Sequence, residues 1–388
     1  MQTNRSLGMQ VLFVLLPIAA SLLVSAGLVM LVGRNPVEVA TTVWEGAFRD
    51  LRRVAGVFNF WIPLTLATLG VVVTFRAGLW NIGVEGQMMF GAIAASGVAI
   101  FVGGGRPFSF FGTEVVLTAP SYITLPLAIV AAMFGGMFWA LVVGLLKTRL
   151  GVHEIFGGVA LNAIANVFTN YLVGNAWAPE GGSALDTGPF AESARLGTVT
   201  SEFPTNVTMI IFVLISAVAV TLALRGTRWG LELKATGHNP RSALLLGVAT
   251  ERTALSAFIV CGALAGIGGA YRVLFTFGTL RPLVSGGIGF LAILVSLLVS
   301  HQALSVAMVT FIFAALLFGS TRLRVAMRLD ASLAQVLQGV LVLLVMLSNG
   351  LRTRFFSDEK PPPDEVTKTK NEPQNPNMTP VEVAGGQD

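Results

Sequence analysis

Amide and carboxylate side chains interrupt two apolar stretches of this sequence. The first stretch, TFRAGLWNIGVEGQMMFGAIAAS, covers residues 74–96 and contains Asn81, Glu85 and Gln87. The second, GGVALNAIANVFTNYLVG, repeats asparagine every four residues. An amide offers two donors and two acceptor sites, which suit the hydroxyl groups of a sugar and also suit hydrogen bonds between helices. The stretches therefore contain either the lining of a path for a polar solute or contacts that join helices.

In the second stretch, the spacing of the asparagines helps to decide between lining a solute path and joining helices. Each step of four residues turns an α-helix by only about 40° beyond a full turn, so all three asparagines share one face. A single asparagine would favour a structural hydrogen bond, whereas three on one face favour a lining role. We therefore predict six pathway residues: Asn81, Glu85, Gln87, Asn162, Asn166 and Asn170.

The first stretch also allows an alternative in which its charged residues mark the ends of two helices. Arg76 would anchor one helix at the lipid headgroups, and Glu85 would cap the start of the next helix. Asn81 and Gln87 are harder to explain in this way, because both are uncharged and lie against apolar neighbours. The glycines of this stretch predict a bent or broken entry to the second helix.

The elements that must position these residues are membrane-spanning helices. Of the 388 residues, 54% are apolar and 12% are charged, whereas ordinary globular domains carry about 25% charged residues. Apolar runs of about 20 residues recur, which is the length that crosses a bilayer. We predict an all-α fold, a polytopic bundle of about ten helices, some short or broken, with both termini in the cytoplasm. The expected spans are residues 9–32, 57–75, 86–104, 121–146, 156–176, 206–225, 254–275, 286–300, 303–320 and 332–350.

Glycine-rich segments mark two special places among these spans. The two spans before the last are short, and the first of them opens with the run Ser285 to Gly289. They are either broken helices of a transport path or a tight hairpin between two thin helices. Gly262, Gly266 and Ala270 are spaced by four residues, which predicts close packing of helix backbones. No strand precedes them, so they are not a dinucleotide-binding motif.

Charge asymmetry predicts how the chain is oriented. The acidic loop 177–205 is expected outside, and the basic loop 225–252 is expected in the cytoplasm. The transmembrane domain covers residues 1–356, and residues 357–388, rich in Pro, Asn, Glu and Lys, are expected to form a disordered cytoplasmic tail. Three basic residues then fall on the outer side, against the positive-inside rule, so this rule does not fix the topology of the last third of the chain. They are Arg322, Arg324 and Arg328.

Several kinds of chemistry are missing from the sequence. It contains no G-x-x-x-x-G-K-[ST] phosphate loop and no arrangement of catalytic residues, so we expect a transport subunit without its own ATPase site. Three scattered histidines and the single Cys261 predict no metal site. The net charge of +5 comes from basic residues at the ends of apolar runs, which predicts contact with membrane lipid and not with nucleic acid.

The loop 225–252, RGTRWGLELKATGHNPRSALLLGVATER, has the features of a docking element. Asn239-Pro240 is typical of a helix start, and residues 241–248 read as a short helix. A solvated basic loop is the simple alternative. The stretch ATGHNPRSALLLGVA is apolar on one side yet lies outside the membrane, which favours docking to a partner.

At this loop the sequence resembles a known family. FRAGLWNIGVEGQMMFGAIAA together with KATGHNPRSALLLGV resembles the permease subunits of bacterial ABC importers for simple sugars, nucleosides and branched-chain amino acids. The nucleoside and simple-sugar branch is the most similar, and the resemblance covers roughly residues 12–351. It implies two permease subunits, identical or sister chains, in the bacterial cytoplasmic membrane. It also implies two separate ATPase subunits that use ATP and Mg, and an external solute-binding lipoprotein.

The resemblance also implies a role for the docking loop. Its helix would seat in a groove of the ATPase and transmit ATP-driven closure to the permease. The residues that match this coupling motif are Gly237, His238, Asn239, Pro240 and Arg241. On this basis we expect Gly237→Trp to leave the chain folded and to stop transport.

Other interpretations stay open at this point. A secondary transporter or channel would need no ATPase, and a membrane scaffold would need no pathway. Within the resembling family, a permease for branched-chain amino acids is the alternative to one for nucleosides or sugars. Phe156, Gly157 and Gly158 make the approach to Asn162 less polar than in the family, and SHQALSV replaces a more usual Asn-Pro turn. Both departures leave the substrate open.

Overall fold

The computed structural model describes most of the chain between residues 23 and 328. The described residues are 23–24, 26–31, 33–110, 113–179, 181, 185–198, 200–299 and 303–328, with single positions at 336, 339, 340 and 343. All of them belong to one compact unit, residues 1–346. Most of the expected span 9–32, nearly all of the span 332–350 and the expected tail lie outside the described residues.

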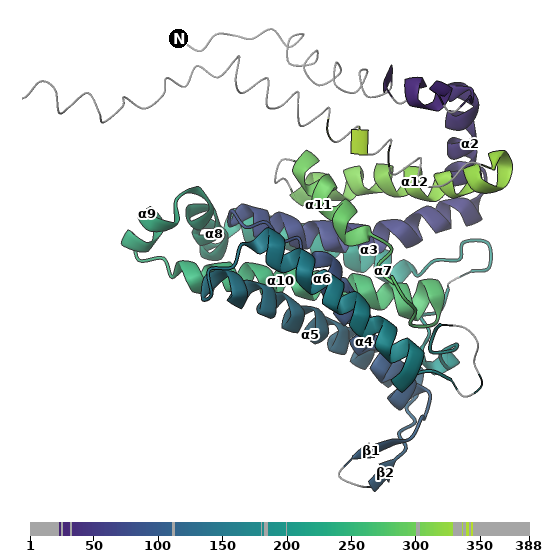
Figure 1. Cartoon of the computed structure of the whole chain (residues 1–388), viewed down its shortest axis with the longest axis horizontal. Coiled ribbons are helices and arrows are strands. Elements are labelled where there is room, and N and C mark those ends of the chain that lie inside the picture. The colour runs from purple at the N-terminus through teal and green to yellow at the C-terminus, as the bar shows by residue number, and fades with distance from the viewer. Residues whose placement is uncertain are drawn as a thin grey trace, which may run out of the picture. The chain divides into compact units, whose positions relative to one another are not determined.

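The fold is a helical bundle, as the composition predicts (Figure 1). Seven helices are long and apolar enough to cross a membrane among the described residues. Their order, with the shorter elements between them, is α2 (Pro36–Phe48), α3 (Leu51–Arg76), α4 (Val84–Val98) with η1 (Ala99–Gly103), β1 (Phe108–Phe110), β2 (Thr113–Val115), α5 (Ser121–Thr148), α6 (Glu154–Tyr171) with η2 (Leu172–Ala176), η3 (Glu192–Ala194), α7 (Val207–Gly226), α8 (Arg228–His238), α9 (Pro240–Leu245), α10 (Thr250–Tyr271) with η4 (Arg272–Phe277), α11 (Ile288–Leu298) and α12 (Ala303–Met327). The placement of both termini in the cytoplasm stays a prediction.

Local sequence explains where several helices begin. Asn35, Asp50 and Asn206 accept hydrogen bonds from backbone N–H groups in the first turns of α2, α3 and α7. Thr227 and Asn239 do the same for α8 and α9. A side-chain oxygen at this position satisfies an N–H that has no partner within the helix. These caps divide the chain between α7 and α10 into two short helices instead of one loop.

Glycines bring α4, α5 and α10 into backbone contact at the centre of the bundle. A Cβ added at Gly91 of α4 would lie 2.3 Å from the Cα of Gly266 of α10. A Cβ at Gly136 of α5 would lie 2.0 Å from the carbonyl oxygen of Gly262. No side chain fits at such distances, so the three helices can pack this closely only with glycine. The predicted packing role of the glycines in α10 is confirmed.

The two spans that the sequence makes short differ in the structure. α11 has 11 residues, about 16 Å of helix, which is too short to cross a bilayer. α12 has 25 residues, so the expectation of a second short span ending at 320 is wrong. Arg322 near its end pairs with Glu45 of α2 at 2.7 Å, so the helix can continue through this charged residue. The prediction of a short element opened by glycines is therefore confirmed for α11 alone.

The two ends of the bundle carry different structures. α8 and α9 lie together at one end, and the antiparallel hairpin β1–β2 lies at the opposite end (Figure 1). The loop at 187–196 also bonds to the segment that follows η4, through Thr187 to Leu280 and Phe190 to Gly278. From there the chain turns back, and α11 begins inside the bundle against the first turn of α4.

Candidate functional site

Asn81 and Gln87 form an amide pair at the entry to α4. Each side-chain amide donates to the other, over 3.2 Å from Asn81 and 3.0 Å from Gln87. Asn81 also donates to the Sγ of Cys261 on α10 at 3.0 Å. All three side chains are completely buried. We name Asn81, Gln87 and Cys261 the amide cluster, and its hydrogen bonds join α4 to α10.

Glu85 contacts a different helix, α11. Its carboxylate accepts hydrogen bonds from the hydroxyl of Ser285 and from the backbone N–H groups of Gly287 and Gly289, the latter two at 3.0 and 2.7 Å. Its side chain is 3% exposed. Glu85 lies in the first turn of α4, as the helix-end alternative expects, but the hydrogen bonds of its carboxylate cap the start of α11, about 200 residues further along the chain.

The asparagine stripe, Asn162, Asn166 and Asn170 of α6, is divided by the structure. Asn162 accepts from the N–H of Gly86 at 2.8 Å and donates to the carbonyl of Ile82 at 2.9 Å. Asn166 and Asn170 are half-buried, and among the described residues the Oδ1 atom of each is buried without a hydrogen-bond partner. One member of the stripe therefore holds the entry to α4, while the other two have an unused acceptor.

Aromatic rings of α4, α5 and α6 pack against one another. Phe90 of α4 stacks on Trp139 of α5, with ring centroids 3.7 Å apart, and lies parallel to Phe168 of α6 at 5.7 Å. Within the described part of the chain, the buried Nε1–H of Trp139 has no acceptor. The ring cluster therefore combines flat apolar surfaces with one unused donor, which are features of sites for ring-shaped polar solutes.

Four of the six predicted residues meet at the entry to α4. Asn81, Glu85 and Gln87 lie within this segment, and Asn162 bonds to its backbone. Asn166 and Asn170 continue along α6. The assignment of all six to the solute pathway stays a prediction. The sequence reasoning did not find the partners of Glu85 on α11, although the glycine run that opens this helix is a visible signal of them.

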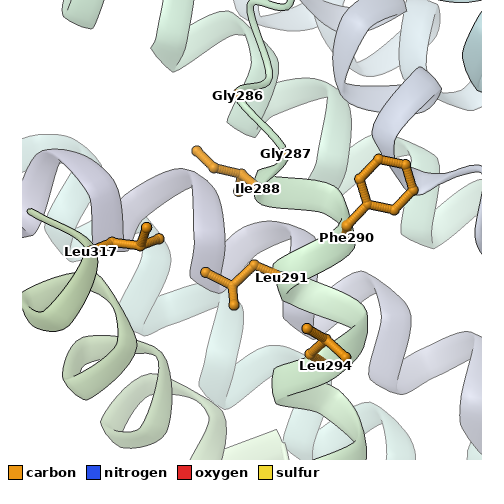
Figure 2. A pocket seen from close by; sticks show the side chains of 7 residues that line it. All are labelled: Gly286, Gly287, Ile288, Phe290, Leu291, Leu294 and Leu317. Carbon is orange, nitrogen blue, oxygen red and sulfur yellow. The ribbon is translucent and has the colours of Figure 1, made fainter. Parts of the chain in front are cut away.

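A cavity of about 220 Å³ adjoins the start of α11. Figure 2 shows Leu291 of α11 and Leu317 of α12 pointing toward each other across the space between the two helices. The cavity is lined by glycine and apolar residues: Gly286, Gly287, Ile288, Phe290, Leu291, Leu294 and Leu317. None of these side chains carries a charge, and Glu85 is not among them.

The short helix α9 forms an exposed apolar tip. Asn239 caps it by accepting from the N–H of Ser242 at 3.1 Å, and Pro240 is its first residue. We define the α9 tip as Leu244, Leu245 and Leu246, which are 61%, 89% and 82% exposed. It lies between the candidate spans 207–226 and 250–277 and belongs to neither. Exposed apolar clusters of this kind mark interaction sites.

The predicted coupling residues occupy two different environments. His238, Asn239, Pro240 and Arg241 are exposed beside the α9 tip. Gly237 instead faces α3, and a Cβ there would lie 2.5 Å from the carbonyl oxygen of Arg76. The expectation that Gly237→Trp leaves the chain folded is therefore wrong, because a side chain at this position has no room.

Comparison with known proteins assigns the chain to a family of transport proteins. The family described as "Branched-chain amino acid transport system / permease component" matches residues 53–346. The chain therefore belongs to this family. It is a multi-pass membrane protein and a permease component of an ABC transport system, and the resemblance noted from its motifs is confirmed.

Curated relatives carry more specific names. The chain is 30% identical to the guanosine ABC transporter permease protein NupP of Bacillus subtilis, over 87% of this chain and 94% of the relative. It is 29% identical to the glucose permease protein TsgB13 of Haloferax volcanii, over 74% of each chain. It is 26% identical to the nucleoside permease protein NupB of Lactococcus lactis, over 80% of this chain and 82% of the relative. No solved structure matches the chain at a comparable significance.

Proposed function

We propose that this chain forms the translocation pathway of an importer for a nucleoside or a simple sugar. The printed names of three well-covered relatives support this substrate class. Two separate features also support it: the unused amide oxygens of Asn166 and Asn170, which would accept hydrogen bonds from hydroxyl groups, and the stacked rings of Phe90 and Trp139, which offer a flat apolar surface.

The observation that carries the proposal is the α9 tip. Three consecutive leucines are exposed outside the candidate spans, and burying their side chains in an apolar groove of a partner would lower the free energy. We propose that this groove belongs to a separate ATPase subunit, which binds ATP and Mg, while this chain binds neither. The exposed residues His238 to Arg241 surround the tip and would fix its orientation in the groove.

Membership of the ABC permease family supports the remaining parts of the proposed assembly. A second permease subunit, identical or a sister chain, would complete the pathway in the bacterial cytoplasmic membrane. The end of the bundle opposite α9 would receive solute from an external solute-binding lipoprotein. A secondary transporter or channel has no use for an apolar tip at this place, which is why we favour the ATP-driven importer.

Leu245→Asp in the complete transporter tests this proposal. A carboxylate in an apolar groove is desolvated without a partner, so ATPase co-purification and solute uptake should each fall about tenfold or more. Leu150→Asp is the matched control, because Leu150 is also an exposed leucine, 71% accessible, in a connection between two spans. Normal ATPase binding and uptake in Leu245→Asp would contradict the docking role of the tip.

A further inference from the structure

The start of α11 presents unsatisfied backbone N–H groups to the interior of the bundle. The first N–H groups of any helix lack partners within the helix, and the helix dipole adds partial positive charge at this end. Gly286 and Gly287 have φ values of 63° and 76°, which turn the chain so that these N–H groups face α4. Half-helices in transporters use such ends to bind the anionic group of a solute.

In this chain the position is already occupied by Glu85. The carboxylate accepts from Ser285, Gly287 and Gly289, which belong to the first turn of α11 and the residues just before it. A Cβ added at Gly289 would lie 2.7 Å from the Cα of Glu85, so α11 is pressed against α4 at this point. Glu85 therefore already uses the N–H groups that this helix start directs at α4.

Arg272 completes the charge arrangement on the other side of the segment. Its Nε donates to the carbonyl of Val284 at 3.1 Å, and its guanidinium lies over the rings of Phe277 and Phe60 at 4.4 and 5.3 Å. It interacts electrostatically with Glu85 and is only 5% exposed. This positive charge lies close to Glu85 and is covered by aromatic rings. Arg281, whose guanidinium lies over the same Phe277 ring at 3.7 Å, adds a second positive charge beside Arg272.

We propose that Glu85 is a built-in anion which fills the anion-binding position at the start of α11, and that the permease consequently selects uncharged solutes. The lining of the neighbouring cavity supports this, because it consists of glycine and apolar residues. The selectivity is electrostatic, since an anionic solute at the start of α11 would meet the charge of Glu85 at N–H groups that Glu85 already uses. This part of the proposal rests on the proposed transport function, whereas the occupancy of the helix start by Glu85 does not.

Chemical rescue tests the occupancy. Purified full-length permease is unfolded thermally in sodium formate and in sodium chloride of equal concentration, with the wild type, Glu85→Ala and Glu85→Gln compared. We expect Glu85→Ala to lower the unfolding midpoint by about 5 °C and formate to restore at least half of this shift, because formate enters the vacated position. Glu85→Gln keeps the shape without the charge, so its midpoint should fall without rescue.

Both variants can contradict the proposal that Glu85 occupies the start of α11. Equal unfolding midpoints of Glu85→Ala in formate and in chloride would overturn it. If Glu85→Ala does not fold, Glu85→Gln still tests the role of the charge, and an unchanged midpoint in that variant would also overturn it.

A second measurement tests the selectivity without a binding protein. The purified permease is given uridine or uridine monophosphate at equal millimolar concentration, and the shift of the unfolding midpoint is recorded. We expect uridine to raise the midpoint of the wild type, and uridine monophosphate, which is the same nucleoside with an anionic group, to raise it only in Glu85→Ala. A shift by uridine monophosphate in the wild type equal to that of uridine would overturn the selectivity. If neither solute shifts the wild type, the nucleoside assignment fails, and the formate measurement still decides the role of Glu85.

Discussion

The amide cluster and the asparagine stripe contain the same kind of side chain but differ in whether its hydrogen-bonding groups are paired. In the amide cluster, Asn81 and Gln87 satisfy each other and are completely buried. In the asparagine stripe, the Oδ1 atoms of Asn166 and Asn170 have no donor among the described residues. A buried acceptor without a partner costs about 1–3 kcal/mol. Paired amides therefore hold this bundle together, whereas unpaired amides are available to a ligand.

Asn162 should show the largest effect of any amide in the comparison. Asn162→Leu leaves two backbone groups unpaired, the N–H of Gly86 and the carbonyl of Ile82. At about 1–3 kcal/mol for each group, we expect a loss of about 3 kcal/mol in the free energy of unfolding, measured by thermal or denaturant unfolding in detergent.

The matched control for this substitution is Asn175→Leu. Asn175 is exposed and follows α6 in the same helical run, where it makes one hydrogen bond to the carbonyl of Tyr171. It should change stability by less than about 0.5 kcal/mol. Equal effects of the two substitutions would show that Asn162 does not hold the entry to α4.

Asn81 should show an intermediate effect. Asn81→Leu leaves the buried amide of Gln87 without its partner and should cost about 2 kcal/mol. The double variant Asn81→Leu, Gln87→Leu removes both partners, so it should cost less than the sum of the two single changes. A double-mutant cycle on unfolding free energies measures this coupling, and strict additivity would show that the two amides act independently.

Asn166 and Asn170 should show the smallest effect on stability and a clear effect on transport. Leucine at either position removes an acceptor that the described residues do not use, so the unfolding free energy should change by less than about 0.5 kcal/mol. Solute uptake in the complete transporter should fall about tenfold if a solute hydroxyl bonds there. Unchanged uptake in both variants would remove the asparagine stripe from the pathway.

The sequence predicts the helical bundle and several of its details. Composition and apolar run length predict the membrane fold, Asn239-Pro240 predicts the start of α9, and four-residue spacing predicts the packing of Gly262 and Gly266. Each of these rests on local chemistry or on the helix period. Local patterns of this kind need no knowledge of which helices become neighbours.

The sequence cannot predict the partners that distant segments provide. The spacing of the asparagine stripe is regular, yet only Asn162 meets backbone groups of another segment. Glu85 binds donors about 200 residues away, and its local position gives no sign of them. Arg322 of α12 likewise pairs with Glu45 of α2, a partner that its own neighbourhood in the sequence does not indicate.

The burial of Cys261 has a practical consequence for following this protein in motion. It is the one cysteine of the chain, and its sulfur is enclosed with Asn81 in the interior. Thiol reagents reach a sulfur only where solvent does, so the native protein resists labelling at this residue while the amide cluster stays closed. A time course of thiol modification during ATP turnover therefore reports whether α4 and α10 separate at this point, with no foreign probe introduced.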